Sequence, residues 1–286
     1  MYHEPTRPRS EIDTEMSTYF QDKVVIVTGA STGIGLETAL AFARAGARIV
    51  LAARTQVTLQ GVVDGHPELR ERLLIVPADV TKDEDVRRLV AATITRFGRV
   101  DILINNAGIG MRADIVDAPV DDAHSVMEVN FFGPLRCIQA VLPHMRQQGA
   151  GQIVNIGSIL SVVVAPRNGV YSASKFALLA MSDALRMELH GTGIEVISVL
   201  PAYTNTPFFE KMYRYGNAAR MSPFKGQHPA QVARAILRGC ARHKRQVVLT
   251  VSSRIAIALR RLSPRLLDFI VRQTAQRALK AESKNR

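Results

Sequence analysis

Short apolar runs alternate with longer amphipathic stretches through most of this sequence, and this alternation restricts the chain to few folds. Six runs are typical of strands, at residues 23–28, 48–53, 73–79, 100–105, 152–157 and 194–200, and residues 246–251 form a candidate seventh. Helical spacing follows residue 28 and recurs at 83–97, 121–148 and 171–190. Wholly apolar strands separated by helices indicate a parallel sheet covered on both faces. We therefore predict an α/β fold with a doubly wound, Rossmann-type parallel sheet of about seven strands.

The segments that flank this pattern differ from it. Residues 1–20 contain two prolines and no apolar periodicity, so we expect a mobile N-terminal extension. Residues 21–251, which contain all of these runs, would form the main domain. Residues 252–286 would form a basic amphipathic helical extension, with Leu266, Leu267, Ile270 and Val271 on one helical face. That face has two alternatives: it contacts an anionic membrane surface peripherally, or it packs on the body or a second subunit and covers the substrate pocket.

The net charge of +12 lies entirely in the last fifth of the chain. Residues 231–286 contain 14 Lys and Arg against 2 Asp and Glu, whereas residues 1–230 contain 23 of each. Nucleic acid is not an expected partner, because the basic tail has almost no interleaved aromatic residues for base stacking. Cys137 and Cys240 form no metal-binding motif, so no metal is expected. With no signal peptide and no apolar run long enough to span a bilayer, a cytoplasmic location is expected, with membrane-peripheral contact as the alternative.

The sequence TGASTGIG, residues 28–35, follows the first expected strand and opens the first helix. Gly29 allows a tight turn, Gly33 lets backbone approach a pyrophosphate, and Gly35 lets the helix pack closely on the strand. The helix N-terminus then offers free N–H groups to a phosphate. The candidate cofactor residues in this turn are Gly29, Ser31, Thr32, Gly33, Ile34 and Gly35.

The ends of the next two strands bear on the choice of cofactor. An acidic residue at the end of the second strand would bind the ribose of NAD, but here Ala53 is followed by Arg54. Arg54 can pair with a 2′-phosphate, so NADP is favoured over NAD; the alternative is a solvated surface arginine. Asp79, with Val80, would reach the adenine edge, and Asp79 is also a candidate N-cap for the helix that begins near Lys82.

The fourth strand ends in Asn105-Asn106-Ala107-Gly108. Ligands in such sheets bind outside the carboxyl ends of the strands. Because Ala107 and Gly108 are small, they leave room for a ribose or nicotinamide, and Asn106, Ala107 and Gly108 are therefore candidate cofactor residues.

Tyr171 and Lys175 lie at positions i and i+4 of an expected helix and therefore share one face. A nearby ammonium favours the phenolate, so we expect the pKa of Tyr171 to be lowered. Tyr171 could then donate a proton to a carbonyl or accept one from an alcohol. Taken alone, the pair is also compatible with a partly buried tyrosine beside a snorkelling lysine.

Two further polar residues accompany this pair. Ser158, thirteen residues before Tyr171, ends the fifth strand and could hydrogen-bond a substrate carbonyl; a capping serine is the alternative. Asn130 is a polar residue in an apolar helical stretch. It could hold water in a proton relay from Lys175, or it could bond to local backbone and bend the helix.

TGASTGIG, NNAG, Asn130, Ser158 and YSASK together resemble the short-chain dehydrogenase/reductase family in its one-domain form, over residues 22–251. The resemblance implies strand order 3-2-1-4-5-6-7 and a catalytic set of Asn130, Ser158, Tyr171 and Lys175. It also implies that Lys175 hydrogen-bonds the nicotinamide ribose, that hydride moves to or from a carbonyl carbon, and that the tyrosine handles the proton. A homodimer or homotetramer through helices 121–148 and 171–190 is expected.

One departure from the family pattern falls after the sixth strand. The family commonly has Pro-Gly there, followed by a threonine that contacts the nicotinamide amide, whereas this chain has Ala202 after Pro201. Thr204 and Thr206 stay candidates for that contact, with Thr206 the better match. The irregular stretch 202–227 is expected to determine the substrate.

The sequence thus predicts an NADP-dependent oxidoreductase that interconverts a small-molecule carbonyl and a secondary alcohol. The alternative is a non-catalytic dinucleotide sensor whose tail binds a membrane or a partner. A further alternative is reduction of a lipid-like carbonyl, because residues 159–165 and the Phe208-Phe209 pair are apolar and could line a pocket.

Overall fold

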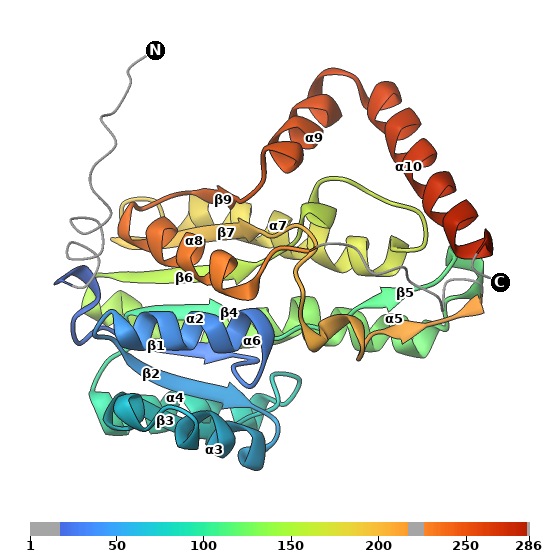
Figure 1. Ribbon diagram of the computed structural model, residues 1–286. Coiled ribbons are helices and arrows are strands. Elements are labelled where there is room, and N and C mark those ends of the chain that lie inside the picture. The colour runs from blue at the N-terminus through green and yellow to red at the C-terminus, as the bar shows by residue number, and fades with distance from the viewer. Residues whose placement is uncertain (1–17, 217–225, 285–286) are drawn as a thin grey trace.

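The computed structural model describes residues 18–216 and 226–284, with side chains up to residue 276. Within this part, seven parallel strands form one sheet in the order β3-β2-β1-β4-β6-β7-β9 (Figure 1). The strands are β1 Val24–Thr28, β2 Arg48–Ala53, β3 Leu73–Pro77, β4 Ile102–Asn105, β6 Gly151–Ile156, β7 Ile194–Leu200 and β9 Gln246–Val248. Two short strands, β5 Met111–Arg112 and β8 Tyr213–Arg214, pair only with each other and are not part of this sheet. The seven strands of the main sheet, counted in chain order, have the order 3-2-1-4-5-6-7, so the expected sheet and strand order are confirmed.

Helices cover both faces of the sheet. One face packs on α2 Gly33–Arg44, α3 Gln56–Asp64 and α8 Pro229–Ala241, and the other on α4 Asp83–Phe97, α6 Gly133–Gln148 and α7 Gly169–Glu188. Along β1, Val25 and Val27 belong to the first core and Ile26 to the second, as the two-residue period of a strand requires. The expected doubly wound architecture follows from this burial on both sides.

The single helix expected over residues 121–148 is wrong. The structure has α5 Val120–Met127, then a π-helical turn at Glu128–Phe132, then α6. Asn130 lies in this turn with no exposed surface, and its side chain bonds to residues outside the helix. An inserted π turn lets the helix turn this polar side chain inward, which a regular helix of the same length would not do.

Several boundaries also differ from the expected ones. The candidate seventh strand ends at Val248, and the third at Pro77 instead of residue 79. Residues 18–20, expected in the mobile extension, form a helical turn; Phe20 is 0% exposed and its ring lies 4.8 Å from that of Phe42. Phe20 is therefore part of the core and holds this helical turn against the body. The rest of the expected extension, residues 1–17, lies outside the described residues.

Two helices follow the last strand: α9 Val251–Leu262 and α10 Pro264–Lys284. They form an arch over the edge of the sheet where the strands end, and α10 descends toward β5 and α5 (red in Figure 1). Thr250 caps α9 by accepting a hydrogen bond from the Ser253 backbone N–H at 3.1 Å, and Pro264 begins α10. The expected helical extension is therefore two helices, of which the first begins at Val251.

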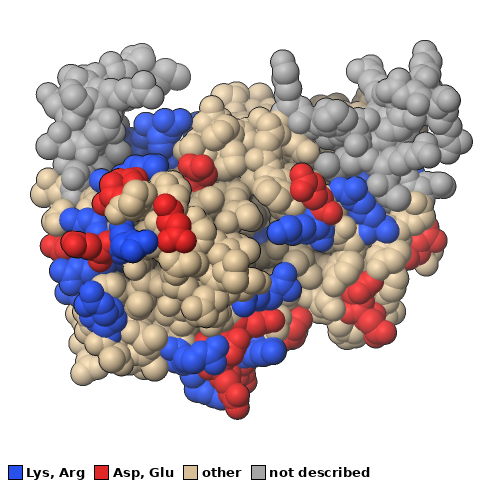
Figure 2. All heavy atoms as spheres, turned by 60° about the horizontal axis from the view of Figure 1, so that its bottom comes forward, with Lys and Arg blue, Asp and Glu red and all other residues tan. Residues whose placement is uncertain are grey.

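Figure 2 shows one face of the body, where basic and acidic side chains are intermixed around a largely uncharged centre. This fits the equal numbers of acidic and basic residues in residues 1–230.

Candidate active site

The turn between β1 and α2 has the backbone that its glycines predict. Gly29 and Gly33 adopt φ angles of +64° and +59°, in the left-handed region that favours glycine. A Cβ on Gly35 would lie 2.3 Å from both the Gly29 carbonyl oxygen and the Asn106 Nδ2 atom. Gly35 is buried behind the turn and lets α2 pack closely, whereas the cavity is lined by the other five residues expected here: Gly29, Ser31, Thr32, Gly33 and Ile34.

Hydrogen bonds from the end of β4 hold this turn in place. The Asn106 side chain donates to the Thr28 and Gly29 carbonyl oxygens at 2.9 and 3.2 Å. The Thr28 hydroxyl accepts from the backbone N–H groups of Asn106 and Ala107 at 3.0 and 3.1 Å. Sequence reasoning missed Thr28, although a threonine that ends a buried strand needs partners for its hydroxyl. Asn106, Ala107 and Gly108 all line the cavity, as expected.

The expected adenine-side residues also line the cavity. Arg54 is exposed at its edge, just beyond β2, and Asp79 and Val80 follow β3. Asp79 does not cap α4: its carboxylate accepts hydrogen bonds from the backbone N–H and hydroxyl of Thr81, at 3.0 and 2.8 Å. The N-cap position of α4 is Lys82, three residues later, so the capping alternative for Asp79 is wrong.

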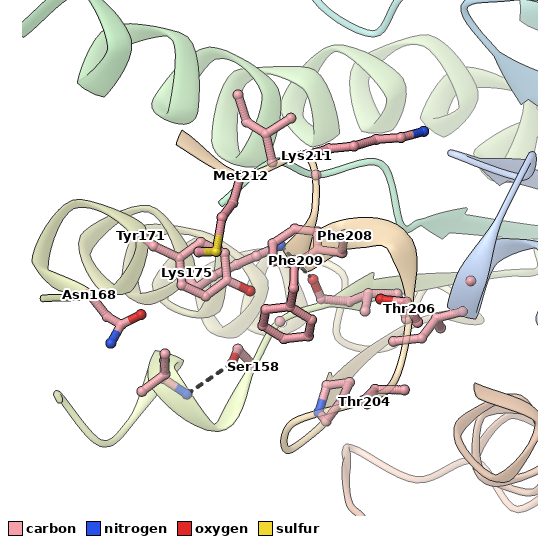
Figure 3. Close-up of a pocket in the computed structure, with 18 of the residues that line it drawn as sticks. Ser158, Asn168, Tyr171, Lys175, Thr204, Thr206, Phe208, Phe209, Lys211 and Met212 are labelled. Carbon is pink, nitrogen blue, oxygen red and sulfur yellow. Dashed lines mark hydrogen bonds between the residues drawn. The ribbon is translucent and has the colours of Figure 1, made fainter. Parts of the chain in front are cut away.

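Tyr171 and Ser158 both line the cavity, and Ser158 is near enough to lower the pKa of the Tyr171 hydroxyl. Tyr171 lies in the first turn of α7, and Ser158 follows β6, where its hydroxyl also accepts from the Leu160 backbone N–H at 3.1 Å (Figure 3). The capping interpretation of Ser158 is therefore confirmed, and its contact with a substrate carbonyl stays a prediction. Lys175, one turn after Tyr171, is 4% exposed and donates to the Ile156 carbonyl oxygen at 2.9 Å. The three expected side chains thus lie around one end of the cavity.

The expected lowering of the pKa of Tyr171 is not what the structure shows. Burial raises the pKa of Tyr171 to about 12, and the nearby Ser158 offsets only part of this shift. Burial lowers the pKa of Lys175 to about 8. The Lys175 Nζ atom lies 5.9 Å from the centre of the Tyr171 ring and is directed to the Ile156 carbonyl, so burial dominates over charge attraction at the tyrosine.

The amide of Asn130 joins three parts of the site. Its Oδ1 atom accepts from the Ile109 backbone N–H at 2.9 Å, and its Nδ2 atom donates to the Ile109 carbonyl and the Ser174 hydroxyl, both at 2.9 Å. A Cβ on Gly108 would lie 3.1 Å from Asn130 Oδ1 and 3.6 Å from Lys175 Nζ. The Asn130 side chain therefore fixes the segment beside Lys175, and its own hydrogen bonds are made with protein groups.

The segment after β7 closes the other side of the cavity. Thr206 lies over the glycine turn, since its Cγ2 atom is 3.0 Å from the place of a Cβ on Gly33. Thr204 is buried and donates to the Ala202 carbonyl at 3.0 Å. Both threonines line the cavity, and Thr206 is the better placed to reach a ligand on the turn. Part of the expected substrate loop, residues 217–225, lies outside the described residues.

One cavity of about 1170 Å³ joins all these parts. Its lining includes side chains that sequence reasoning did not select, among them Arg112, Arg167, Met212 and Ala256, and also Leu267, which was expected on the apolar face of the extension. Leu267 comes from α10, so the extension contributes to this cavity. Among the residues that the structure describes, no group of three His, Cys, Asp or Glu side chains is placed to hold a metal ion.

A doubly wound sheet whose first turn approaches the carboxyl ends of its strands in this way is the framework of a dinucleotide-binding protein. Residues 23–215 match the short chain dehydrogenase family. A relative from Danio rerio, "Dehydrogenase/reductase SDR family member 7B", is 38% identical over 269 residues, which are 90% of this chain and 87% of the relative. "Uncharacterized oxidoreductase YxnA" of Bacillus subtilis is 32% identical over 266 residues, covering 92% and 75% of the two chains. The chain belongs to the short-chain dehydrogenase/reductase family and is an oxidoreductase of that family.

Solved structures agree with this assignment. A short chain dehydrogenase/reductase from Burkholderia phymatum in complex with NAD has a TM-score of 0.78 and 25% identity, covering 86% of this chain and 95% of its own. The alcohol dehydrogenase of Thermococcus sibiricus, complexed with 5-hydroxy-NADP, has a TM-score of 0.68 and 27% identity, covering 76% and 90%. One relative is thus bound to NAD and the other to an NADP derivative. No helix in the described part of this chain has the length and hydropathy needed to cross a bilayer.

Proposed function

We propose that this protein interconverts a carbonyl compound and a secondary alcohol with NADP(H), using Tyr171 as the proton donor and acceptor. The observation that carries the proposal is that Tyr171, Ser158 and Lys175 line the same cavity as the glycine turn. A dinucleotide sensor with no catalytic activity, the alternative expected from sequence, would need no such proton donor.

The residues of the turn fit a dinucleotide. Gly29 and Gly33 have backbone angles that leave N–H groups and space for a pyrophosphate, and a Cβ on Gly33 would be within 3.0 Å of Thr206. Ser31, Thr32 and Ile34 lie beside them on the cavity, with Asp79 and Val80 toward the adenine side. When bound, the nicotinamide supplies or takes up the hydride.

Each polar side chain then has one task. The Tyr171 hydroxyl donates a proton to the substrate oxygen in reduction and accepts it in oxidation. The Ser158 hydroxyl orients that oxygen and stabilises the charge that develops on it. Because burial raises its pKa to about 12, Tyr171 holds its proton at neutral pH, which suits the reductive direction. Lys175 supplies a buried cation beside the site, and Asn130 holds the segment that lies against Lys175.

The assay is the oxidation of NADPH, followed by its absorbance, with a panel of ketones and aldehydes. Tyr171→Phe removes only the hydroxyl, so kcat should fall by roughly 10² to 10⁴-fold while NADPH still binds. Tyr213→Phe, a change of the same kind in a second tyrosine of the cavity, is the matched control and should keep its activity. Full activity in Tyr171→Phe would reject the proposed role.

The preference for NADP rests on Arg54. Its guanidinium lies exposed at the cavity edge just after β2, where a 2′-phosphate could accept a charge-assisted pair of hydrogen bonds. Arg54→Asp should therefore weaken NADPH binding by about 10- to 100-fold and leave NADH binding nearly unchanged, since such bonds contribute about 1.5–3 kcal/mol. Arg87→Asp, an exposed arginine on α4, is the control. Equal weakening of NADH and NADPH would remove Arg54 from the phosphate site.

The assembly and surroundings of the protein are also proposals. The long helices α6 and α7 offer the surface through which a homodimer or homotetramer would form, and Met187 of α7 is exposed there. On the arch, Val251, Ile255 and Leu262 are exposed near arginines, which suits peripheral contact with anionic lipid. Light scattering tests the first, and sedimentation with anionic against neutral vesicles tests the second. A monomer, or equal sedimentation with both vesicles, would contradict them.

A further inference from the structure

The helix α10 presents one apolar stripe to the cavity that contains Tyr171. Its cavity-lining residues follow the three- and four-residue spacing of a helix face: Leu267, Ile270, Val271, Thr274 and Ala275. The last of these residues lies eight positions after the first, so the stripe is about 12 Å long at 1.5 Å per residue. Ala256 of α9 lines the same cavity. The arch is therefore one wall of the site.

At Leu267 the helix turns one side to the cavity, whereas Ile270 of the same stripe keeps 42% of its surface exposed. Leu267 is 4% exposed, whereas Leu266, the residue before it, is 47% exposed. The charged side chains Arg265, Asp268 and Arg272 are exposed on other sides of the helix. The side of α10 that faces the cavity is thus apolar except for the hydroxyl of Thr274, and the charges of the helix point elsewhere.

Apolar side chains also line other parts of the cavity, together with the charged Arg112, Arg167 and Lys211. Ile159, Leu160 and Val163 come from the segment after Ser158, and Phe208, Phe209 and Met212 come from the segment after β7. Figure 3 shows Phe208, Phe209 and Met212 around Tyr171, and the Tyr171 and Phe208 ring centres are 5.8 Å apart. A substrate whose oxygen reaches Tyr171 would therefore extend from there between apolar side chains toward α10.

The volume of the cavity supports a long ligand. At about 1170 Å³ it is larger than the roughly 300–1,000 Å³ of a pocket for one small ligand. The glycine turn and Arg54 account for the dinucleotide part, and the α10 wall lies in addition to it. Water ordered against so much apolar surface is released when an alkyl chain replaces it.

We propose that the substrate is a carbonyl compound or alcohol with an extended alkyl chain, and that Leu267, Ile270 and Val271 of α10 bind that chain. The inference rests on the proposed function and names the substrate class of the same site. In the reductive direction the carbonyl carbon gains a hydride from NADPH and its oxygen gains a proton from Tyr171, which is restored from solvent. The alkyl chain takes no part in the chemistry and contributes only binding.

Chain length gives a quantitative expectation. A buried methylene contributes about 0.8 kcal/mol, which is roughly a fourfold change in an equilibrium constant. For a series of methyl ketones from butanone to decanone, kcat/KM should therefore rise about fourfold per methylene until the chain reaches the end of the stripe. The full-length protein and NADPH are used throughout.

Paired leucine variants test the wall. Leu267→Gln should flatten the dependence of kcat/KM on chain length, and Leu267→Met should restore most of the slope. Leu266→Gln makes the same change on the outward side and should keep the slope of the unchanged protein. Thermal melting of each variant identifies loss of folding, and Val271→Gln provides a second site if Leu267→Gln does not fold.

The outcomes separate the two proposals. The α10 inference would be overturned if kcat/KM of the wild-type protein did not change with chain length, or if Leu266→Gln and Leu267→Gln had equal effects. Carbonyl reduction would still stand. If no ketone is reduced, calorimetric titration of decanol and butanol into the NADPH-bound protein decides. Tighter binding of decanol that Leu267→Gln removes would support the wall without the proposed reaction, and equal weak binding would refute both.

Discussion

Replacing Asn130 by alanine should destabilise the protein strongly, because a buried amide with three partners is removed. Asn130 is 0% exposed and makes hydrogen bonds of 2.9 Å to the Ile109 N–H, the Ile109 carbonyl and the Ser174 hydroxyl. In Asn130→Ala, both backbone groups of Ile109 lose their side-chain partner. A buried polar group left unsatisfied costs about 1–3 kcal/mol, so the free energy of unfolding should fall by about 2–5 kcal/mol.

This loss can be measured by calorimetry and by urea unfolding. At about 2–4 °C per kcal/mol for a large domain, the expected decrease in Tm is on the order of 10 °C. Asn168→Ala is the matched control: Asn168 also lines the cavity, but its side chain donates only to the Pro166 carbonyl, at 3.0 Å in an exposed setting. The control should lose less than about 1.5 kcal/mol.

Two results would refute this reasoning. If Asn130→Ala has the same Tm as Asn168→Ala, the three hydrogen bonds do not stabilise the fold as their burial implies. If it keeps its Tm but loses kcat, the amide acts in the chemistry, as a relay residue would, and not by holding Ile109 beside Lys175. Loss of both Tm and kcat is the expected result, because Gly108 lies between the Asn130 amide and the Lys175 ammonium.

Three further expectations follow from the backbone and from one buried charge. Gly35→Ala should lower Tm and NADPH affinity together, because its Cβ would meet the Gly29 carbonyl at 2.3 Å; an unchanged affinity would contradict the close packing. Gly61→Ala in α3 meets no atom within 4 Å and should raise the free energy of unfolding by about 0.8–1 kcal/mol, as urea titration would measure. Burial lowers the pKa of Lys175 from 10.5 to about 8, so the folded protein binds fewer protons than the unfolded chain between these values. Its contribution to stability should therefore rise with pH from about 8 to 10, and urea unfolding should show this rise in the unchanged protein but not in Lys175→Met.

Much of the fold was predictable because its strands are buried on both faces. Residues 48–53 and 194–200 were expected as strands and are strands, and residues 83–97 were expected as a helix and are one. Continuous apolar runs of this kind have few other solutions. The π turn at Asn130 was not predictable in the same way. The side-chain period on either side of it is helical, and the partner that draws Asn130 inward, Ile109, is distant in sequence.

In the candidate site, too, features set by a residue's own chemistry were predictable, whereas features set by distant contacts were not. The turn glycines carry their backbone requirement in their own chemistry, and Gly29 and Gly33 have the positive φ angles expected of them. The expected pKa of Tyr171 was wrong because spacing shows that Lys175 is near but not where its ammonium is directed or how dry the site is. Leu267 lines the cavity because α10 folds back over the sheet. Helix periodicity shows that α10 has an apolar face, but it does not show whether that face meets the body, a second subunit or a membrane.

The dinucleotide turn is encoded near the beginning of the body, and the α10 wall is encoded after its last strand. During synthesis the glycine turn leaves the ribosome early. The apolar part of the cavity beside Tyr171 lacks its α10 wall until the last helices have been made. A nascent chain interrupted near Val251 would carry Ile159, Leu160 and Phe208 without their cover. Such an intermediate is the kind of species that chaperones bind, so the proposed α10 wall would also affect how the newly made chain folds.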